Sequence, residues 1–107
     1  MMLLTKENRR DLPPLYSQDG QGMEAVAYVK FFGGGRWTFY ATEFDGQDTF
    51  FGWCVSALGP DCDELGYLSL AELEAMRFPP FGLGAERDRY FRPAKLSAIL
   101  EPASSAA

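Results

Sequence analysis

Residues 37–46 read WTFYATEFDG, and this stretch decides the fold that we predict. Most of its residues up to Phe44 are aromatic or β-branched, which is typical of a strand. Side chains of a strand alternate between its two faces, so we expect positions 37, 39 and 41 on one face and positions 38, 40, 42 and 44 on the other. Asp45-Gly46 is a strong hairpin signal, which predicts that the chain turns back at this point.

The segments on either side continue the same pattern. Residues 23–32 alternate in the same way and are predicted as a strand, connected to the next one by three glycines at residues 33–35. Residues 49–55 are predicted as a third strand, and residues 65–68 as a short fourth strand. These connections are too short for the crossovers that parallel strands need, so we expect an antiparallel meander.

Short helices complete the predicted domain. Thr5 can cap a helix that runs to Asp11, because the prolines after Leu12 end it. Ser69 and Glu72 have the spacing of a capping box at the start of a second helix. A third short helix is expected between residues 93 and 100.

The chain has 107 residues, of which 47% are hydrophobic, and this is the length of one domain. We therefore predict a single α+β domain over residues 1–101, in which an antiparallel meander of three to four strands packs with two or three short helices. The small and polar residues 102–107 are expected to form a disordered tail.

The expected compartment is the cytoplasm. No apolar run approaches the ~20 residues that cross a bilayer. The apolar residues 1–4 are followed at once by charged ones, which is the reverse of a secretory signal. We therefore expect no membrane contact, and we expect Cys54 and Cys62 to be free thiols.

The charge is unevenly distributed along the chain. The net charge is −5, and residues 37–76 contain eight acidic residues and no Lys or Arg. Residues 1–36 and 77–107 carry net charges of only +1 and +2. An acidic region repels phosphate backbones and attracts basic surfaces, so we expect a protein partner with a basic surface and no direct contact with nucleic acid. Ordinary solubilising charge remains an alternative explanation.

The sequence contains no histidine. This absence removes the commonest general base, the usual partner of nucleophilic Ser or Cys, and a frequent transition-metal ligand. We therefore expect no enzymatic activity, no cofactor and no metal. Glu43, Asp45 and Asp48 could together hold calcium or magnesium. Their spacing matches no EF-hand, and we favour a solvated turn in which Asp45 accepts hydrogen bonds from its own backbone.

The aromatic residues between positions 37 and 53 allow two interpretations. They could stack nucleic-acid bases, but such platforms include Arg and Lys, so core packing is the better interpretation. Some aromatic side chains could still lie exposed beside carboxylates and anchor a protein partner. The candidate partner-binding residues are acidic or aromatic: Glu43, Asp45, Asp48, Trp53, Asp61, Asp63 and Glu64.

Several motifs together resemble one family of small bacterial proteins. They are LLTKEN at residues 3–8, LPPLY at 12–16, VKFF at 29–32, WTFYATEFDG at 37–46, LGY at 65–67 and ERDRYF at 86–91. The family is catalogued as domain of unknown function 2958, and the resemblance extends to about Pro93. It implies no activity and no catalytic residues. Members of the family look like genes of plasmids and integrative elements.

The leading functional hypothesis is an accessory factor of a mobile genetic element. It would inhibit a host defence complex that targets nucleic acid, as anti-CRISPR and anti-restriction proteins do, by presenting an acidic surface to a basic groove.

Two alternatives stay open. The first is a plasmid maintenance or transfer module that binds a small molecule or a partner protein. The second is a histidine-free hydrolase that uses carboxylates and a divalent metal. A homodimer is also conceivable, formed through an isolated sheet edge near Glu86.

Overall fold

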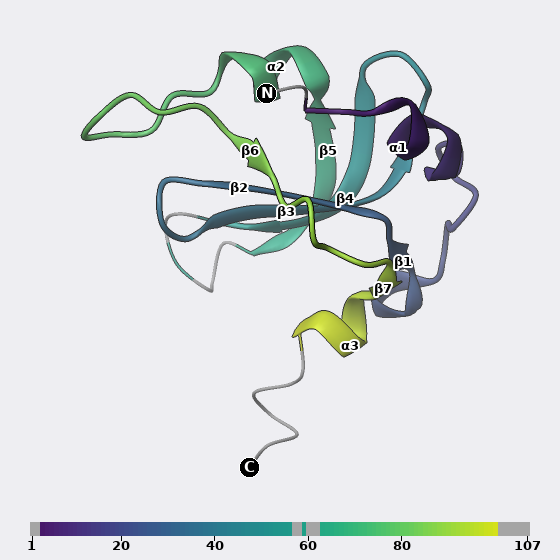
Figure 1. Ribbon diagram of the computed structural model, residues 1–107. Coiled ribbons are helices and arrows are strands. Elements are labelled where there is room, and N and C mark those ends of the chain that lie inside the picture. Colours follow the sequence, from purple (N-terminus) through teal and green to yellow (C-terminus); the bar gives the residue numbers. More distant parts are fainter. Residues whose placement is uncertain (1–2, 57–58, 60–62, 101–107) are drawn as a thin grey trace.

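The structure is a computed structural model that describes residues 3–56, 59 and 63–100. Its elements in chain order are α1 (Lys6–Asp11), the 3-10 helix η1 (Gly22–Glu24), β1 (Val26–Ala27), β2 (Val29–Gly33), β3 (Trp37–Phe44), β4 (Thr49–Val55), β5 (Glu64–Ser69), α2 (Leu70–Ala75), β6 (Glu86–Arg87), β7 (Ala94–Lys95) and α3 (Leu96–Leu100). A five-stranded sheet in the order β5-β4-β3-β2-β6 forms the middle layer, and β1 pairs separately with β7 (Figure 1). The predicted single α+β domain is confirmed, while the predicted tail lies outside the described residues.

The antiparallel meander is present as predicted. Strands β2 to β5 follow one another in space as they do in the chain, and every pair is antiparallel. Tyr40 lies opposite Trp53, and Phe51 lies opposite Tyr67. Strand β6 adds a fifth, short member beside β2. The meander therefore has one long outer strand, β5, and one edge covered by only two residues.

The predicted strand over residues 23–32 is wrong at its start. Its first residues belong to η1, and β1 pairs with β7 rather than with the large sheet. The break falls at Tyr28, which donates its main-chain N–H to the carbonyl oxygen of Ala41 at 2.8 Å. Alternation of side chains continues through both strands, so a sequence pattern does not reveal that the hydrogen-bonding partner changes.

A β-bulge in β3 corrects the predicted faces of that strand. Ala41 lies opposite Gly52, but Glu43 lies opposite Phe51, so Thr42 is the extra residue. The hydroxyl of Thr42 donates to the carbonyl oxygen of Phe51 at 3.0 Å. A bulge of one residue shifts all later side chains to the opposite face. Phe44 therefore lies on the face of Ala41, and Glu43 lies on the other.

Both faces of the sheet are covered. On one face, Phe31, Phe39, Phe44 and Phe50 form a core with Leu4 and Leu12, which flank α1, and with Leu70 and Leu73 of α2. The rings of Phe44 and Phe50 stack with their centroids 4.5 Å apart. Most of the aromatic side chains between positions 37 and 53 thus pack in a core, which is the interpretation that the sequence favoured.

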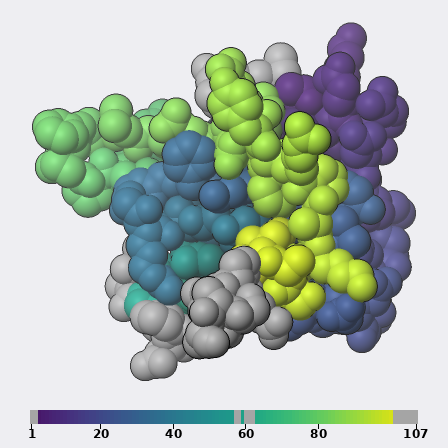
Figure 2. All heavy atoms as spheres, turned by 60° about the horizontal axis from the view of Figure 1, so that its bottom comes forward, coloured from purple at the N-terminus to yellow at the C-terminus, as the bar shows by residue number. Residues whose placement is uncertain are grey.

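The other face carries a smaller cluster. Ala25, Ala27 and Leu96 are buried there, and Trp53 packs against them half-exposed. Figure 2 shows α3, which begins with Leu96, against the segment that contains η1 and β1. This layer leaves part of the sheet near β4 and β5 uncovered by a helix, and the candidate site lies there.

The helix starts follow the predicted caps. The Thr5 hydroxyl accepts from the N–H of Asn8, and the Ser69 hydroxyl accepts from the N–H of Glu72. The loop between α2 and β6 extends away from the sheet (Figure 1) and exposes Phe81. Among the described helices, none is long and apolar enough to cross a membrane.

Candidate binding site

Glu43 is buried, so the prediction that it belongs to an exposed acidic surface is wrong. Only 3% of the residue is exposed. Its Oε1 accepts the main-chain N–H of Tyr16 at 2.8 Å, and its Oε2 accepts that of Gln18 at 2.7 Å. The bulge at Thr42 is the physical reason, because it turns Glu43 toward the loop that contains these two residues.

Asp45 confirms the interpretation of the hairpin as a capped turn. Its Oδ1 accepts the main-chain N–H groups of Gln47, Asp48 and Thr49 at 2.8 to 3.0 Å. These hydrogen bonds lower the pKa of the Asp45 carboxyl below its usual value. Asp45 is exposed, but its function in the fold is local.

Asp48 connects the same turn to α2. Its carboxylate accepts the Ser69 hydroxyl at 2.6 Å and the N–H of Ala71 at 2.9 Å. Within residues 3–56, 59 and 63–100, no group of three His, Cys, Asp or Glu side chains has the arrangement of a metal site. The three carboxylates that the sequence places near the hairpin thus accept hydrogen bonds from three different sets of residues.

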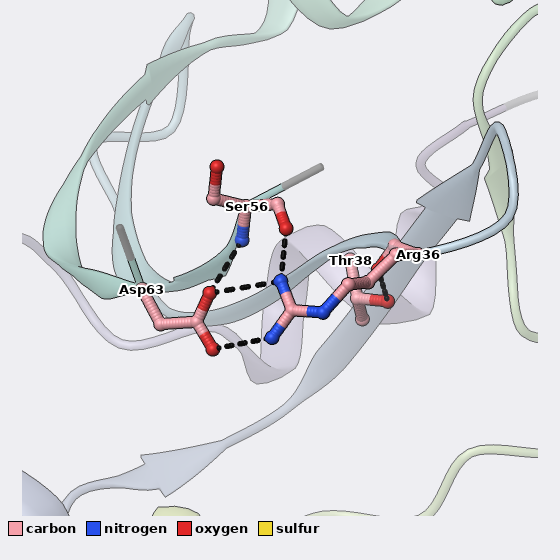
Figure 3. Close-up of polar contacts among 4 residues, drawn as sticks. All are labelled: Arg36, Thr38, Ser56 and Asp63. Carbon is pink, nitrogen blue, oxygen red and sulfur yellow. Dashed lines mark hydrogen bonds and ion pairs between the residues drawn. The ribbon is translucent and has the colours of Figure 1, made fainter. Parts of the chain in front are cut away.

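Asp63 forms an ion pair with Arg36 (Figure 3). Two guanidinium nitrogens of Arg36 donate to the two Asp63 oxygens at 3.1 and 2.9 Å, and the N–H of Ser56 donates to Oδ1 at 2.8 Å. Arg36 also donates to the Ser56 carbonyl oxygen. The hydrogen bond from Arg36 is the main reason that the pKa of the Asp63 carboxyl is lowered.

The predicted acidic set is therefore dispersed. Glu64 is exposed at the start of β5, Trp53 is half-exposed within the smaller cluster, and Asp61 lies outside the described residues. Cys54, a free thiol, packs against the larger core, and burial raises the pKa of its thiol. Cys54 is a free thiol as predicted, and Cys62 lies outside the described residues.

A concave site lies between the loop after α1 and strands β3 to β5. The cavity measures about 340 Å³, within the usual range of small binding pockets. We name it the tyrosine pocket after its main lining residues: Tyr16, Gln18, Asp19, Glu43, Phe51 and Tyr67. It combines aromatic rings with two carboxylates, one of them buried.

The aromatic wall is held by contacts between strands and loop. Tyr67 packs edge-on against Phe51 with ring centroids 4.9 Å apart, although 60% of Tyr67 is exposed. Interaction with the side chain of Tyr16 is the main cause of the raised pKa of the Tyr67 hydroxyl. The negative charges of Glu43 and Asp19 raise the pKa of the Tyr67 hydroxyl further. The Tyr67 hydroxyl therefore lies in a locally negative field.

The loop over the pocket is fixed by one side chain. Gln18 donates from Nε2 to the carbonyl oxygens of Val26 and Thr42 at 3.0 and 2.8 Å, and its Oε1 accepts the N–H of Val26 at 2.7 Å. Tyr16 has a φ of 72°, which is uncommon for a non-glycine residue and requires support from its surroundings. The hydrogen bond from its N–H to Glu43 supplies part of that support.

Sequence reasoning placed no functional residue at Tyr16, Gln18 or Tyr67. The signal that was available for the two tyrosines is their location in the motifs LPPLY at residues 12–16 and LGY at residues 65–67, whereas Gln18 lies in neither motif. Composition could not distinguish these tyrosines from those that pack in the core. Their meeting depends on the loop after α1 crossing to β5, which is a tertiary contact between distant segments.

The tyrosine pocket is suited to a positively charged group. Aromatic faces attract cations by about 0.5 to 2 kcal/mol. None of the ion pairs among the described residues includes Glu43 or Asp19. A guanidinium or ammonium group entering the pocket would therefore find carboxylates that no basic side chain already neutralises.

Comparison with known proteins gives a family and no function. The family model for DUF2958, described as a protein of unknown function, matches residues 3–107. No curated protein and no solved structure matches the chain. Since the family model covers nearly the whole sequence, the chain belongs to the DUF2958 family.

Proposed function

We propose that this protein is a protein-binding module that takes a basic side chain of its partner into the tyrosine pocket. The observation that carries the proposal is Glu43: its buried carboxylate lines an aromatic pocket and accepts two main-chain N–H groups, and none of the ion pairs between described residues includes it. Each carboxylate oxygen can accept more than one hydrogen bond, so both retain capacity for a donor.

The ligand class follows from the lining. Asp19 at the rim and Glu43 in the wall attract a positive charge, and the rings of Tyr16, Phe51 and Tyr67 offer faces or hydroxyls to it. The same carboxylates would repel a phosphate group, so the proposal includes no direct contact with nucleic acid. Arginine suits the pocket better than lysine, because its planar guanidinium both stacks and donates several hydrogen bonds.

The proposed biological role is that of an accessory factor of a mobile genetic element, acting in the cytoplasm. Its partner would be a host defence complex that holds nucleic acid in a basic groove, and capture of an arginine or lysine from that groove would inhibit the complex. Two observations support this role. The net charge is −5, and members of the family look like genes of plasmids and integrative elements. Inhibition through a protein contact requires no catalytic group.

A pull-down from the bacterial host tests this role. The tagged protein is compared with a double variant, Asp19→Asn with Tyr67→Ala, which removes a charge and a ring from exposed positions and leaves the Glu43 hydrogen bonds in place. We expect a nucleic-acid-handling complex with the wild type and its loss with the variant. Equal recovery with both proteins would contradict the tyrosine pocket as the contact.

A second candidate function is supported by the same cavity. Its volume of about 340 Å³ would also accommodate a small amine, which corresponds to a maintenance or transfer module that binds a small molecule. Native mass spectrometry of the protein purified from its host separates the two candidates. A retained small cation that is lost in the double variant would favour the small-molecule function.

A further inference from the structure

Strand β5 is an open edge of the large sheet. It pairs with β4 on one side, and in the part of the chain that the structure describes no strand pairs with its other side. Proteins usually protect such edges with proline, lysine or a bulge. The six residues of β5, ELGYLS, contain no proline and no basic residue, and their pairing with β4 is regular throughout.

Two cavities of different chemistry flank this edge on opposite faces. Leu65 and Tyr67 line the tyrosine pocket. Gly66 and Leu68, on the other face, line a cavity of about 190 Å³. We name it the apolar cleft after most of its lining: Trp37, Phe39, Cys54, Gly66, Leu68 and Met76, together with Glu64 and Tyr67. Tyr67 thus contributes atoms to both cavities.

We propose that an extended segment of the partner pairs with β5 as a sixth strand. Adjacent side chains of a strand point to opposite faces, so one residue of the segment lies over the tyrosine pocket and the next over the apolar cleft. Directly opposite residues approach to about 5 Å between Cβ atoms. The recognised sequence therefore alternates basic and large apolar residues. This inference rests on the proposed function, because the basic residue occupies the same pocket.

The charge of β5 argues against a second copy of this chain as the occupant. Glu64 is the only charged residue of the strand. A copy paired edge to edge would bring only residues of the same strand toward the tyrosine pocket, and none of them is basic, whereas Glu43 and Asp19 already supply negative charge there. The cation that the pocket favours must come from a different chain.

Two peptides of equal composition and charge test the alternation. The first is acetyl-Thr-Arg-Leu-Arg-Leu-Thr-amide, and the second is acetyl-Thr-Arg-Arg-Leu-Leu-Thr-amide, in which the alternation is broken. We expect the first to bind about tenfold more tightly, which corresponds to 1.4 kcal/mol. We also expect it to slow hydrogen exchange of β5 amides. Equal binding of both peptides, or unchanged exchange in β5, would overturn the inference.

Gly66 offers a variant that blocks the apolar cleft without disturbing the fold. A Cβ atom at Gly66 meets nothing within 4 Å, so a larger side chain fits there. Gly66→Leu should weaken binding of the alternating peptide about tenfold, whereas Gly66→Ala, the matched control, should leave it nearly unchanged. Equal peptide affinity of Gly66→Leu and the wild type would contradict the use of the cleft.

Binding of N-acetylarginine methylamide separates the two proposals. This compound carries the basic side chain but cannot extend along β5. If it binds and the two peptides bind equally, strand addition fails and the proposed function stands. If neither it nor the peptides bind, both proposals fail. A concentration-dependent dimer that protects β5 amides without any peptide would also overturn strand addition by a partner.

Discussion

Asp45 and Glu43 lie two residues apart in the chain, yet their carboxylates stabilise two different regions of the molecule. Asp45 accepts N–H groups two to four residues ahead and stabilises its own turn, in full contact with solvent. Glu43 accepts N–H groups from Tyr16 and Gln18, which are 27 and 25 residues away, and it is buried. The same chemical group therefore serves a local turn in one region and the wall of a pocket in the other.

The difference shows how burial changes the consequence of a hydrogen bond. An exposed N–H that loses its partner can bind water, whereas a buried one remains unsatisfied. The turn at residues 45–48 should thus tolerate substitution better than the pocket. The difference in burial also explains why Glu43, and not Asp45, is a candidate binding residue. An electrostatic contact is stronger in a pocket than at an exposed turn, because less water competes for it.

The largest effect is expected for Glu43→Ala. The substitution removes both acceptors and leaves the N–H groups of Tyr16 and Gln18 without partners under the loop. We expect the free energy of unfolding to fall by about 3 kcal/mol. Urea unfolding followed by tryptophan fluorescence measures the loss. A fall no larger than that of Asp45→Ala would remove the distinction between the two regions.

Gln18→Ala should have the next largest effect. It removes the three hydrogen bonds that Gln18 makes with Val26 and Thr42, while Glu43 keeps its own. We expect a loss of about 2 kcal/mol in urea unfolding. Hydrogen exchange should become faster in residues 16–22 and stay unchanged in β4. Unchanged exchange in the loop would show that Gln18 does not hold it.

Asp45→Asn tests the exposed region by its pH dependence. Because the folded state lowers the pKa of Asp45, its contribution to stability is present above the unfolded value, about 3.9, and is lost as the pH falls through the lower folded value. The wild-type urea midpoint should therefore fall more steeply than that of Asp45→Asn below about pH 4. Parallel curves for the two proteins would contradict this assignment.

The smallest effect on stability is expected for Tyr67→Phe, since the residue is largely exposed. The raised pKa of Tyr67 means that the wild type keeps one hydroxyl protonated at a pH where ordinary tyrosines ionise. Ultraviolet difference titration should show the loss of this late-ionising tyrosine in the variant, while unfolding in urea is nearly unchanged. Loss of a tyrosine that ionises in the ordinary range instead would contradict the raised pKa of Tyr67.

Much of the fold could be predicted because its signals are local. The alternation in residues 37–41, the hairpin at Asp45-Gly46 and the capping residues Thr5 and Ser69 all act within a few positions. The same holds for the meander, since each connection is short. The role of Asp45 as a turn cap, which the sequence favoured over a metal site, followed from the same local chemistry.

The candidate site could not be predicted in this way. One extra residue at Thr42 reverses the faces of Glu43 and Phe44, and no sequence pattern marks it. Tyr16 and Tyr67 come together only because the loop after α1 and strands β3, β4 and β5 line the same pocket in the folded protein. The acidic residues that are close in the sequence are separated in the structure. They stabilise a turn, a helix start, an ion pair and a pocket wall, respectively.

Titration of the ¹⁵N-labelled protein with two small compounds addresses the tyrosine pocket most directly. N-acetylarginine methylamide carries the charged guanidinium, and N-acetylcitrulline methylamide has nearly the same shape without the charge. We predict saturable NMR shift changes at Tyr16, Gln18 and Tyr67 with the arginine compound, and at most weak changes with citrulline. Equal responses to both compounds, or changes located elsewhere in the protein, would contradict a pocket that recognises a positive charge.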